Sequence, residues 1–227
     1  MLALLFPLVV MTAVEVERVL AVVNGVPIIA SDAELAEAAV LVPRQVEESD
    51  AEYRRAVVEA LVDLELRWQD LTAAGITARV QIDPDAAWRA TVQRAGGEDA
   101  LHRKLAEMGL GERELRELLR HAAVVQAYVA SRFAPFVRPT PQEVEAVWRQ
   151  ELAPQLEKAG KPVPVLAEVR GEVEALLRER KLSAEIERWT ADLAKRGEIV
   201  RYLPRPAEPA APQTESSPPP APTAHPN

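Results

Sequence analysis

The two ends of this chain carry segments rich in β-branched residues, and almost everything between them has the pattern of helices. The first segment covers residues 16–32. The second is the short run 198–203, which follows Gly197. An isolated strand cannot satisfy its own backbone hydrogen-bonding groups and needs a partner. The simplest partner for the last strand is a hairpin at the front, so we expect both ends of the chain to meet in one small sheet.

Asn24 and Gly25 predict the turn of that hairpin. An Asn-Gly pair fits the two positive-φ positions of a type I′ turn, whose twist matches a two-stranded hairpin. Pro27 has no N–H, which places the second strand at an edge of the sheet. Ser31 and Asp32 follow at once, and we expect them to cap the first helix directly.

Capping residues, prolines and glycines mark the helix boundaries between these ends. The expected starts are three capping boxes and one Asp-Pro cap: Ser31-x-x-Glu34, Ser49-x-x-Glu52, Thr140-Pro141-x-Glu143 and Asp83-Pro84. A short loop is expected over 154–164, followed by a long helix over 165–196 that Gly197 ends. The predicted fold is mainly α, with a small β element formed by the N-terminal hairpin and the C-terminal strand.

Length, charge and composition exclude several classes of protein. At 227 residues the chain suits one domain or two small ones. The net charge of -8 argues against nucleic-acid binding, because no basic surface is available to neutralise phosphates. The absence of Cys excludes thiol catalysis, disulfides and Cys-ligated metals.

The two termini have their own patterns. Residues 1–14 form an apolar run that is too short to span a bilayer, for which about 20 residues are needed. We expect residues 1–13 to be a short, atypical secretory signal, with export to the periplasm or to another place outside the cytoplasm. The alternatives are a buried N-terminal strand or a misassigned start codon. Residues 204–227 are rich in Pro, and we expect a disordered tail that acts as a spacer or a proline-recognition ligand.

No catalytic constellation is visible in the sequence. His102 and His121 lie in helices among Arg and Glu, and His225 lies in the tail. None has a second His at metal-ligand spacing, and solvated surface positions are expected. No Gly-rich phosphate loop follows a strand. We therefore expect no enzyme, no metal and no cofactor.

The order of these pieces resembles the core module of SurA-type periplasmic chaperones. The similarity lies in the hairpin 19–25 with Ile28 and Ser31-Asp32, the 105–110 turn, the 115–132 helix, the 140–144 helix start and the 178–203 end. It covers most of residues 16–203. We divide this module into an N-terminal part, 14–153, and a C-terminal helix and strand, 165–203.

One departure from the family bears on function. Parvulin-type prolyl isomerase domains normally precede the final long helix in that family, and such a domain needs on the order of a hundred residues. Here only 151–164 occupy that place, so the isomerase domain is missing. An isomerase assigned by family name would be inactive.

The resemblance implies an ATP-independent holdase that binds unfolded exported polypeptides, above all outer-membrane protein precursors, without a cofactor. The alternative is a structural or adaptor protein that holds one fixed partner in the same helical groove. Apolar residues near helix breaks are the best candidates for an exposed binding surface. These candidates are Met108, Leu110, Phe133 and Phe136, whereas Trp68 and Trp189 are expected in the core.

Overall fold

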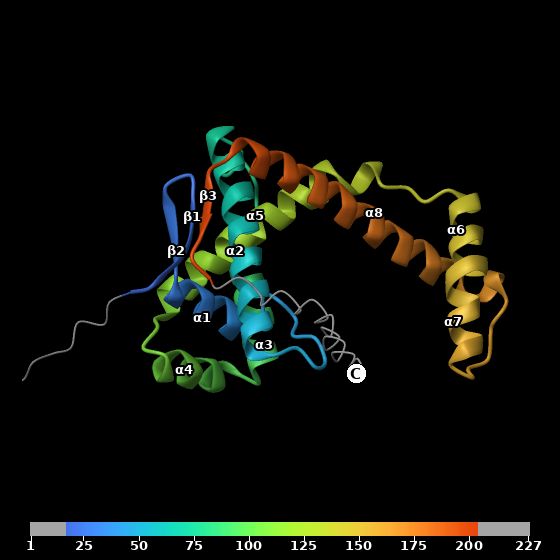
Figure 1. Ribbon diagram of the computed structural model, residues 1–227, viewed down its shortest axis with the longest axis horizontal. Coiled ribbons are helices and arrows are strands. Elements are labelled where there is room, and N and C mark those ends of the chain that lie inside the picture. Colours follow the sequence, from blue (N-terminus) through green and yellow to red (C-terminus); the bar gives the residue numbers. More distant parts are fainter. Residues whose placement is uncertain (1–16, 204–227) are drawn as a thin grey trace, which may run out of the picture.

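The two ends of the chain meet in a three-stranded antiparallel sheet (Figure 1). In the computed structural model, which describes residues 17–203, β1 (Val19–Val23) lies between β2 (Val26–Ile29) and β3 (Ile199–Arg201). Val22 of β1 faces Val200 of β3 in the register. The predicted pairing of the last strand with the hairpin is confirmed. The expected signal, 1–13, and the tail, 204–227, lie outside the described residues.

The hairpin turn also fastens the C-terminal strand. Asn24 and Gly25 have φ values of 50° and 84°, as the type I′ prediction requires. The Asn24 N–H donates to the carbonyl of Glu198 at 2.8 Å, and Asn24 Oδ1 accepts from the Glu198 N–H at 2.7 Å. Gly197 ends the long helix in an extended conformation, with φ of -94°. A Cβ there would lie 3.1 Å from Asn24 Oδ1, so the glycine provides room for this clasp.

Five helices and the sheet pack together around two adjoining cores. The helices are α1 (Ala30–Ala38), α2 (Asp50–Ala73), α3 (Pro84–Ala95), α4 (Glu98–Glu107) and α5 (Glu112–Arg132). One core joins the sheet to α1 and α2, and it includes Leu20, Val57 and Val62. A second joins α1, α3, α4 and α5 around Trp88, Leu101 and Leu115. We call β1–β3 and α1–α5 the body.

The start of α1 differs from the prediction. The helix begins at Ala30, immediately after β2, and Ile29 occupies the capping position. The Asp32 carboxylate reaches back and accepts the Ile29 N–H at 2.9 Å. Ser31 therefore lies in the first turn, and the expected Ser31–Glu34 box is wrong. The strand runs into the helix without a linker, which leaves no residue between them for a serine cap.

The remaining helix starts are confirmed. Ser49 and Glu52 form a capping box at α2, and Asp83 accepts from the Asp85 N–H at α3. Thr140 and its partner three residues later form the box that opens α6 (Pro141–Val147).

After α5, a 3₁₀ turn, η1 (Ala134–Phe136), leads to a separate group of helices. The helix α6 continues through a π-helical turn, η2 (Trp148–Leu152), into α7 (Ala153–Lys158). The expected loop over 154–164 is therefore helical up to Lys158, and only 159–165 connect to α8 (Leu166–Arg196). We call α6, η2, α7 and the first turns of α8, Leu166–Leu177, the arm.

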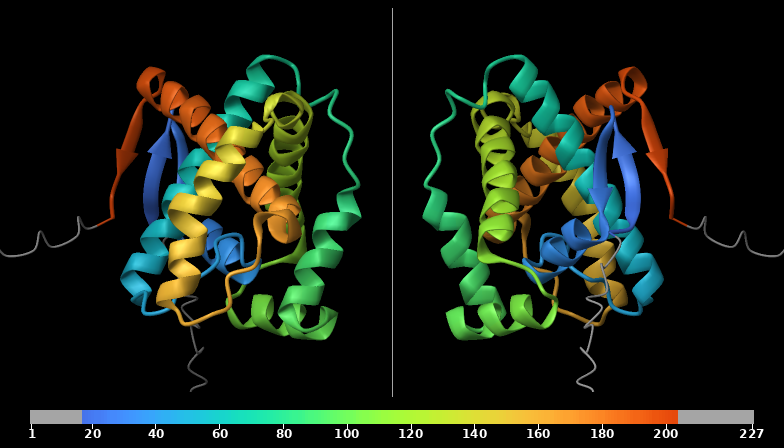
Figure 2. Two further views of the ribbon diagram at one scale, coloured as in Figure 1. Left: turned by 90° about the vertical axis from the view of Figure 1, so that its right-hand side faces the viewer. Right: turned by 90° about the vertical axis from the view of Figure 1, so that its left-hand side faces the viewer.

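Helix α8 runs from the arm back to the body and ends beside the sheet (Figures 1 and 2). Two side-chain hydrogen bonds hold its C-terminal half on α2. Arg67 Nε donates to Thr190 Oγ1 at 2.7 Å, and Trp189 Nε1 donates to Asp70 Oδ2 at 3.2 Å. Of the helices within residues 17–203, none is long and apolar enough to cross a membrane.

Candidate functional site

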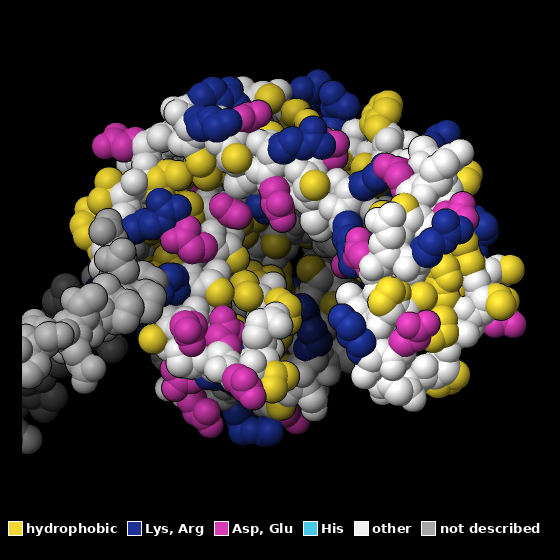
Figure 3. Space-filling model, turned by 45° about the vertical axis from the view of Figure 1, so that its right-hand side comes forward, with side chains coloured by type: hydrophobic (Ala, Val, Ile, Leu, Met, Phe, Trp, Pro, Cys, Tyr) yellow, Lys and Arg dark blue, Asp and Glu magenta, His cyan; other side chains and the backbone are white. Residues whose placement is uncertain are grey.

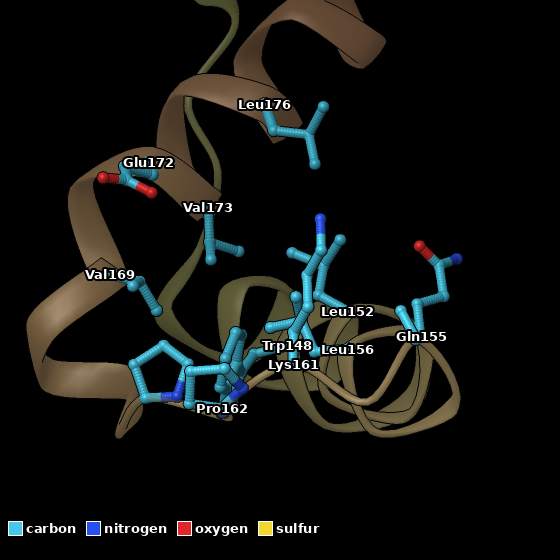
Figure 4. A pocket seen from close by; sticks show the side chains of 12 residues that line it. Trp148, Leu152, Gln155, Leu156, Lys161, Pro162, Val169, Glu172, Val173 and Leu176 are labelled. Atoms are coloured by element: carbon cyan, nitrogen blue, oxygen red, sulfur yellow. The ribbon is translucent and has the colours of Figure 1, made fainter.

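The arm contains a pocket of about 670 Å³ between η2, α7 and the first part of α8 (Figure 4). Its walls are mostly apolar, and its polar groups are few. The apolar lining consists of Trp148, Leu152, Leu156, Ala159, Pro162, Pro164, Val169, Val173 and Leu176. Gln155, Lys161 and Glu172 supply the polar groups. We call this cavity the arm pocket.

The arm has little core of its own. Only Val144, Val173 and Leu177 are buried in it, and the other apolar side chains around them are partly exposed. A pocket of several hundred Å³ with an apolar lining and few polar groups is the usual form of a site for an apolar ligand. Apolar surface that the arm cannot bury by itself is thus available to a bound segment.

The π-helical turn shapes one wall of the pocket. The Ala153 N–H bonds to the Trp148 carbonyl, five residues back, which defines this wider turn. Pro154 lacks an N–H, and its ring would clash with the carbonyl four residues earlier in a regular α-helix. The wider turn just before Pro154 avoids that clash and sets the direction of the Trp148 and Leu152 side chains.

Two ion pairs fasten the opposite wall, on α8, to α6 and η2. Lys181 Nζ lies 2.6 Å from Glu143 Oε1, and Arg180 Nη1 lies 2.6 Å from Glu151 Oε2. The Lys181 ammonium, followed by the N–H and hydroxyl of Thr140, lowers the pKa of Glu143 to about 2. Glu143 is therefore ionised throughout the physiological pH range.

The molecular surface is hollowed between the body and the arm, as the space-filling view shows (Figure 3). Apolar side chains are visible in the depth of this hollow, and charged side chains lie along its margins. A bound chain segment would find apolar contacts inside the hollow and charged groups at its border.

The predicted binding residues do not gather at one site. Met108 and Leu110 are half-buried and pack against the second core of the body. Phe133 is half-buried between Tyr128 and Trp189, with ring centroids 6.1 and 5.7 Å away.

Phe136 is the exception among the four candidates, with 76% of its surface exposed. It lies in η1, where α5 gives way to the arm. None of the four lines the arm pocket.

One wall of the arm pocket was not predicted, although its residues have a regular spacing in the sequence. Trp148, Leu152 and Leu156 recur at four-residue intervals, which is a helical spacing that continues past Pro154. The expected loop over 154–164 begins at this proline and includes Leu156. The unbroken spacing was the signal that could have found this wall.

The two histidines within the described chain differ from each other. His102 is exposed, as expected, and its Nε2 lies 3.0 Å from Glu112 Oε2. His121 is half-buried, and its ring stacks on Trp68 with centroids 3.7 Å apart, so the expected solvated position is wrong. Burial, followed by the nearby Arg120, lowers the pKa of His121. Within residues 17–203 no group of His, Asp and Glu could hold a metal ion.

Comparison with known proteins adds no relative: no protein-family model matches the chain, and no curated protein matches it. The chemistry of the arm pocket is therefore read from its own side chains. They offer apolar contact and a few polar groups, which suit the binding of an apolar stretch of polypeptide.

Proposed function

We propose that the protein is an ATP-independent holdase-type chaperone for unfolded exported polypeptides. The expected clients are outer-membrane protein precursors, and the expected place of action is the periplasm. The observation that carries the proposal is the arm pocket, an apolar cavity of about 670 Å³ in a part of the molecule with only a small core of its own. Such surface is retained where it binds something.

The architecture supports a likeness to the core module of SurA-type chaperones. In this chain the hairpin at the start of the module pairs with the strand at its end and helices fill the space between, and it is this order of pieces that resembles the family. Where that family inserts a parvulin domain, this chain has α7 and the connecting residues 159–165. We propose that the module acts by binding alone, without isomerase activity.

A holdase needs a surface that accepts many sequences. The apolar lining provides this, because dispersion and hydrophobic contacts are not directional. The polar groups of the lining are few, Gln155, Lys161 and Glu172, so the pocket requires few specific hydrogen bonds from a client. An adaptor for one fixed partner would use the same pocket but would not keep unrelated unfolded chains from aggregating.

The test is suppression of aggregation. The protein is titrated into an unfolded outer-membrane β-barrel protein that is diluted from urea, and light scattering is followed without nucleotide. We expect scattering to fall at near-stoichiometric ratios. Unchanged scattering would contradict the holdase and favour the adaptor, whose single partner would then be sought in a periplasmic pull-down.

A pair of variants links the activity to the arm pocket. Leu156 lines the pocket without belonging to the packed core of the arm, so Leu156→Asp should place a charge in the pocket and leave the fold intact. We expect this variant to lose most of the suppression. Val46 is 93% exposed and lies outside the pocket, so Val46→Asp is the matched control and should suppress aggregation fully. Equal activity of both variants would remove the pocket from the proposal.

A further inference from the structure

A second cavity, of about 360 Å³, opens on the body between β2, α1, α2 and α5. Its floor is apolar, and part of it is core: Ile28, Leu35 and Leu61 are buried at its base. Leu64, Leu110 and Leu118 are half-buried along its walls. We call this cavity the β2 groove. It shares no lining residue with the arm pocket.

Every charged side chain that lines the β2 groove is a carboxylate. The four are Asp32, Glu65, Glu114 and Glu117, and no Lys or Arg joins them in the lining. The whole chain has 27 Lys and Arg against 35 Asp and Glu, so its general composition does not explain a rim of one sign. His121 adds no cation at neutral pH, because burial lowers its pKa.

The carboxylates are only partly satisfied within the protein. Asp32 accepts the Ile29 N–H, and Glu65 accepts from Gln69 Nε2 at 2.7 Å. Glu114 pairs with Arg113, its neighbour in sequence, at 2.8 Å. The Glu117 carboxylate has no hydrogen bond or ion pair within the described chain. These groups retain acceptor capacity for a cationic ligand.

The edge of β2 does not offer main-chain pairing to a ligand. In a hairpin with a two-residue turn, the backbone N–H and C=O groups of Val26 and Ile28 point toward the partner strand. Those of Pro27 and Ile29 therefore point outward, away from the sheet. Pro27 has no N–H, and the Ile29 N–H is already bonded to Asp32. A ligand in the groove must therefore be recognised through its side chains rather than as an added strand.

We propose that the β2 groove binds a polypeptide segment in which a large apolar side chain stands next to Lys or Arg. The apolar floor takes the large side chain, and the rim of carboxylates pairs with the cation beside it. An acidic or purely apolar segment lacks the second contact. This site does not depend on the proposed chaperone activity or on the arm pocket.

The electrostatics of Asp32 agree with a cationic ligand. Burial raises the pKa of Asp32, and the nearby Glu17 adds to this effect, so that the Ile29 N–H does not compensate fully. A Lys or Arg placed beside it would favour its ionised form.

The test uses two short peptides that carry a neutral dansyl label, one alternating leucine with lysine and the other alternating leucine with glutamate. Binding to the full chain is followed by fluorescence anisotropy. We expect saturable binding of the lysine peptide and at least about tenfold weaker binding of the glutamate peptide. The affinity for the lysine peptide should also fall as salt rises, a measurement that needs no variant.

Charge-neutral variants locate the site. Glu114→Gln with Glu117→Gln should weaken binding of the lysine peptide about fivefold, as expected for two partly exposed charge pairs. The control pair, Glu179→Gln with Glu187→Gln, makes the same change in net charge at exposed positions of α8 and should bind like the parent.

The outcomes are distinct. Equal binding of both peptides, or equal weakening by both pairs of variants, would overturn the proposal, because the attraction would then be due to net charge or to apolar contact alone. If Leu156→Asp loses binding of the lysine peptide and the Glu114→Gln, Glu117→Gln variant keeps it, the peptide binds in the arm pocket. That result would also overturn the proposal. If the parent protein binds the lysine peptide but does not suppress aggregation, the proposed chaperone function is rejected and the proposal for the β2 groove is retained.

Discussion

Asn24 makes more contacts between distant parts of the chain than a turn residue needs. Its backbone and side chain bond to Glu198, and its Nδ2 donates to Gln69 Oε1 at 2.8 Å. Gln69 in turn donates to the Val23 carbonyl at 3.1 Å. One turn residue thus joins the hairpin to α2 and to the residue before β3. Its side-chain amide reaches Gln69 on one side and Glu198 on the other.

The turn itself can be tested at Gly25. We expect Gly25→Val to lower the free energy of unfolding by about 1–2 kcal/mol, since a β-branched residue is strained at positive φ. Gly171 lies in α8 at an exposed position where a Cβ would meet no atom within 4 Å. Gly171→Ala should therefore raise stability by about 0.5–1 kcal/mol. Urea denaturation of both variants measures the difference, and an unchanged Gly25→Val melt would contradict the type I′ turn.

The ion pair of Glu143 makes the stability of the protein depend on pH, and the direction of this dependence follows from the pKa of Glu143. The pKa of this carboxyl falls from its ordinary value of 4.5 to about 2 in the folded protein, so the unfolded state binds the proton more readily. Its contribution to stability is complete above pH 4.5 and is lost as pH falls toward 2.

We therefore expect the difference in unfolding free energy between the parent and Glu143→Gln to be constant near neutral pH and to shrink between pH 4.5 and 2. Urea titrations at several pH values measure it. The Glu157 side chain on α7 is exposed and forms no ion pair or hydrogen bond within the described chain, so Glu157→Gln is the control for removal of a surface charge from the arm. A difference that does not change with pH would mean that Lys181 does not stabilise the Glu143 carboxylate.

At the level of elements, local chemistry predicted most boundaries. Ser49, Asp83 and Thr140 mark helix starts because each side chain accepts a hydrogen bond from its own first turn, a contact that sequence alone specifies. The start of α1 was less predictable, since it depends on where β2 ends. Strand pairing is a tertiary property, and it decides that Ile29 rather than Ser31 precedes the helix.

The candidate site was harder to predict than the fold. Leu152 and Val169 have the spacing of core residues, and only the packed structure reveals that the arm buries few of its apolar side chains. Met108 and Leu110 do not share a site with Phe136, because both pack partly against the second core of the body, although Leu110 also lines the β2 groove. A helix break exposes residues only where no other element covers it, and the body covers this one in part.

The role of β3 as an element can be measured by truncation. A chain that ends at Leu203 keeps the sheet, whereas one that ends at Gly197 loses β3 and the bonds of Asn24 to Glu198. We expect the shorter chain to be less stable by at least about 3 kcal/mol, because several hydrogen bonds and the contacts of Ile199 with the core are removed together. Thermal melts compare the two, and equal melting temperatures would contradict end-to-end closure.

At the level of the whole molecule, the body and the arm differ in what holds them. The body has two adjoining cores, and its sheet is tied to α2 by a bidentate ion pair between Arg201 and Glu59, at 2.7 and 2.8 Å. The arm depends on one small core and on two ion pairs with α8. A binding surface placed on the less consolidated part can adapt to different ligands without disturbing the sheet.

The end-to-end sheet also sets the order in which the protein can be completed. Asn24 and Glu198 are 174 positions apart, so β1 has no second partner until the residues between them have been made. At about 5–20 residues per second, synthesis of that stretch takes on the order of ten seconds or more. During this time one edge of the nascent hairpin is open to other strands. Until β3 is available, the protein itself therefore exposes an unpaired strand edge, as the unfolded clients proposed for it do.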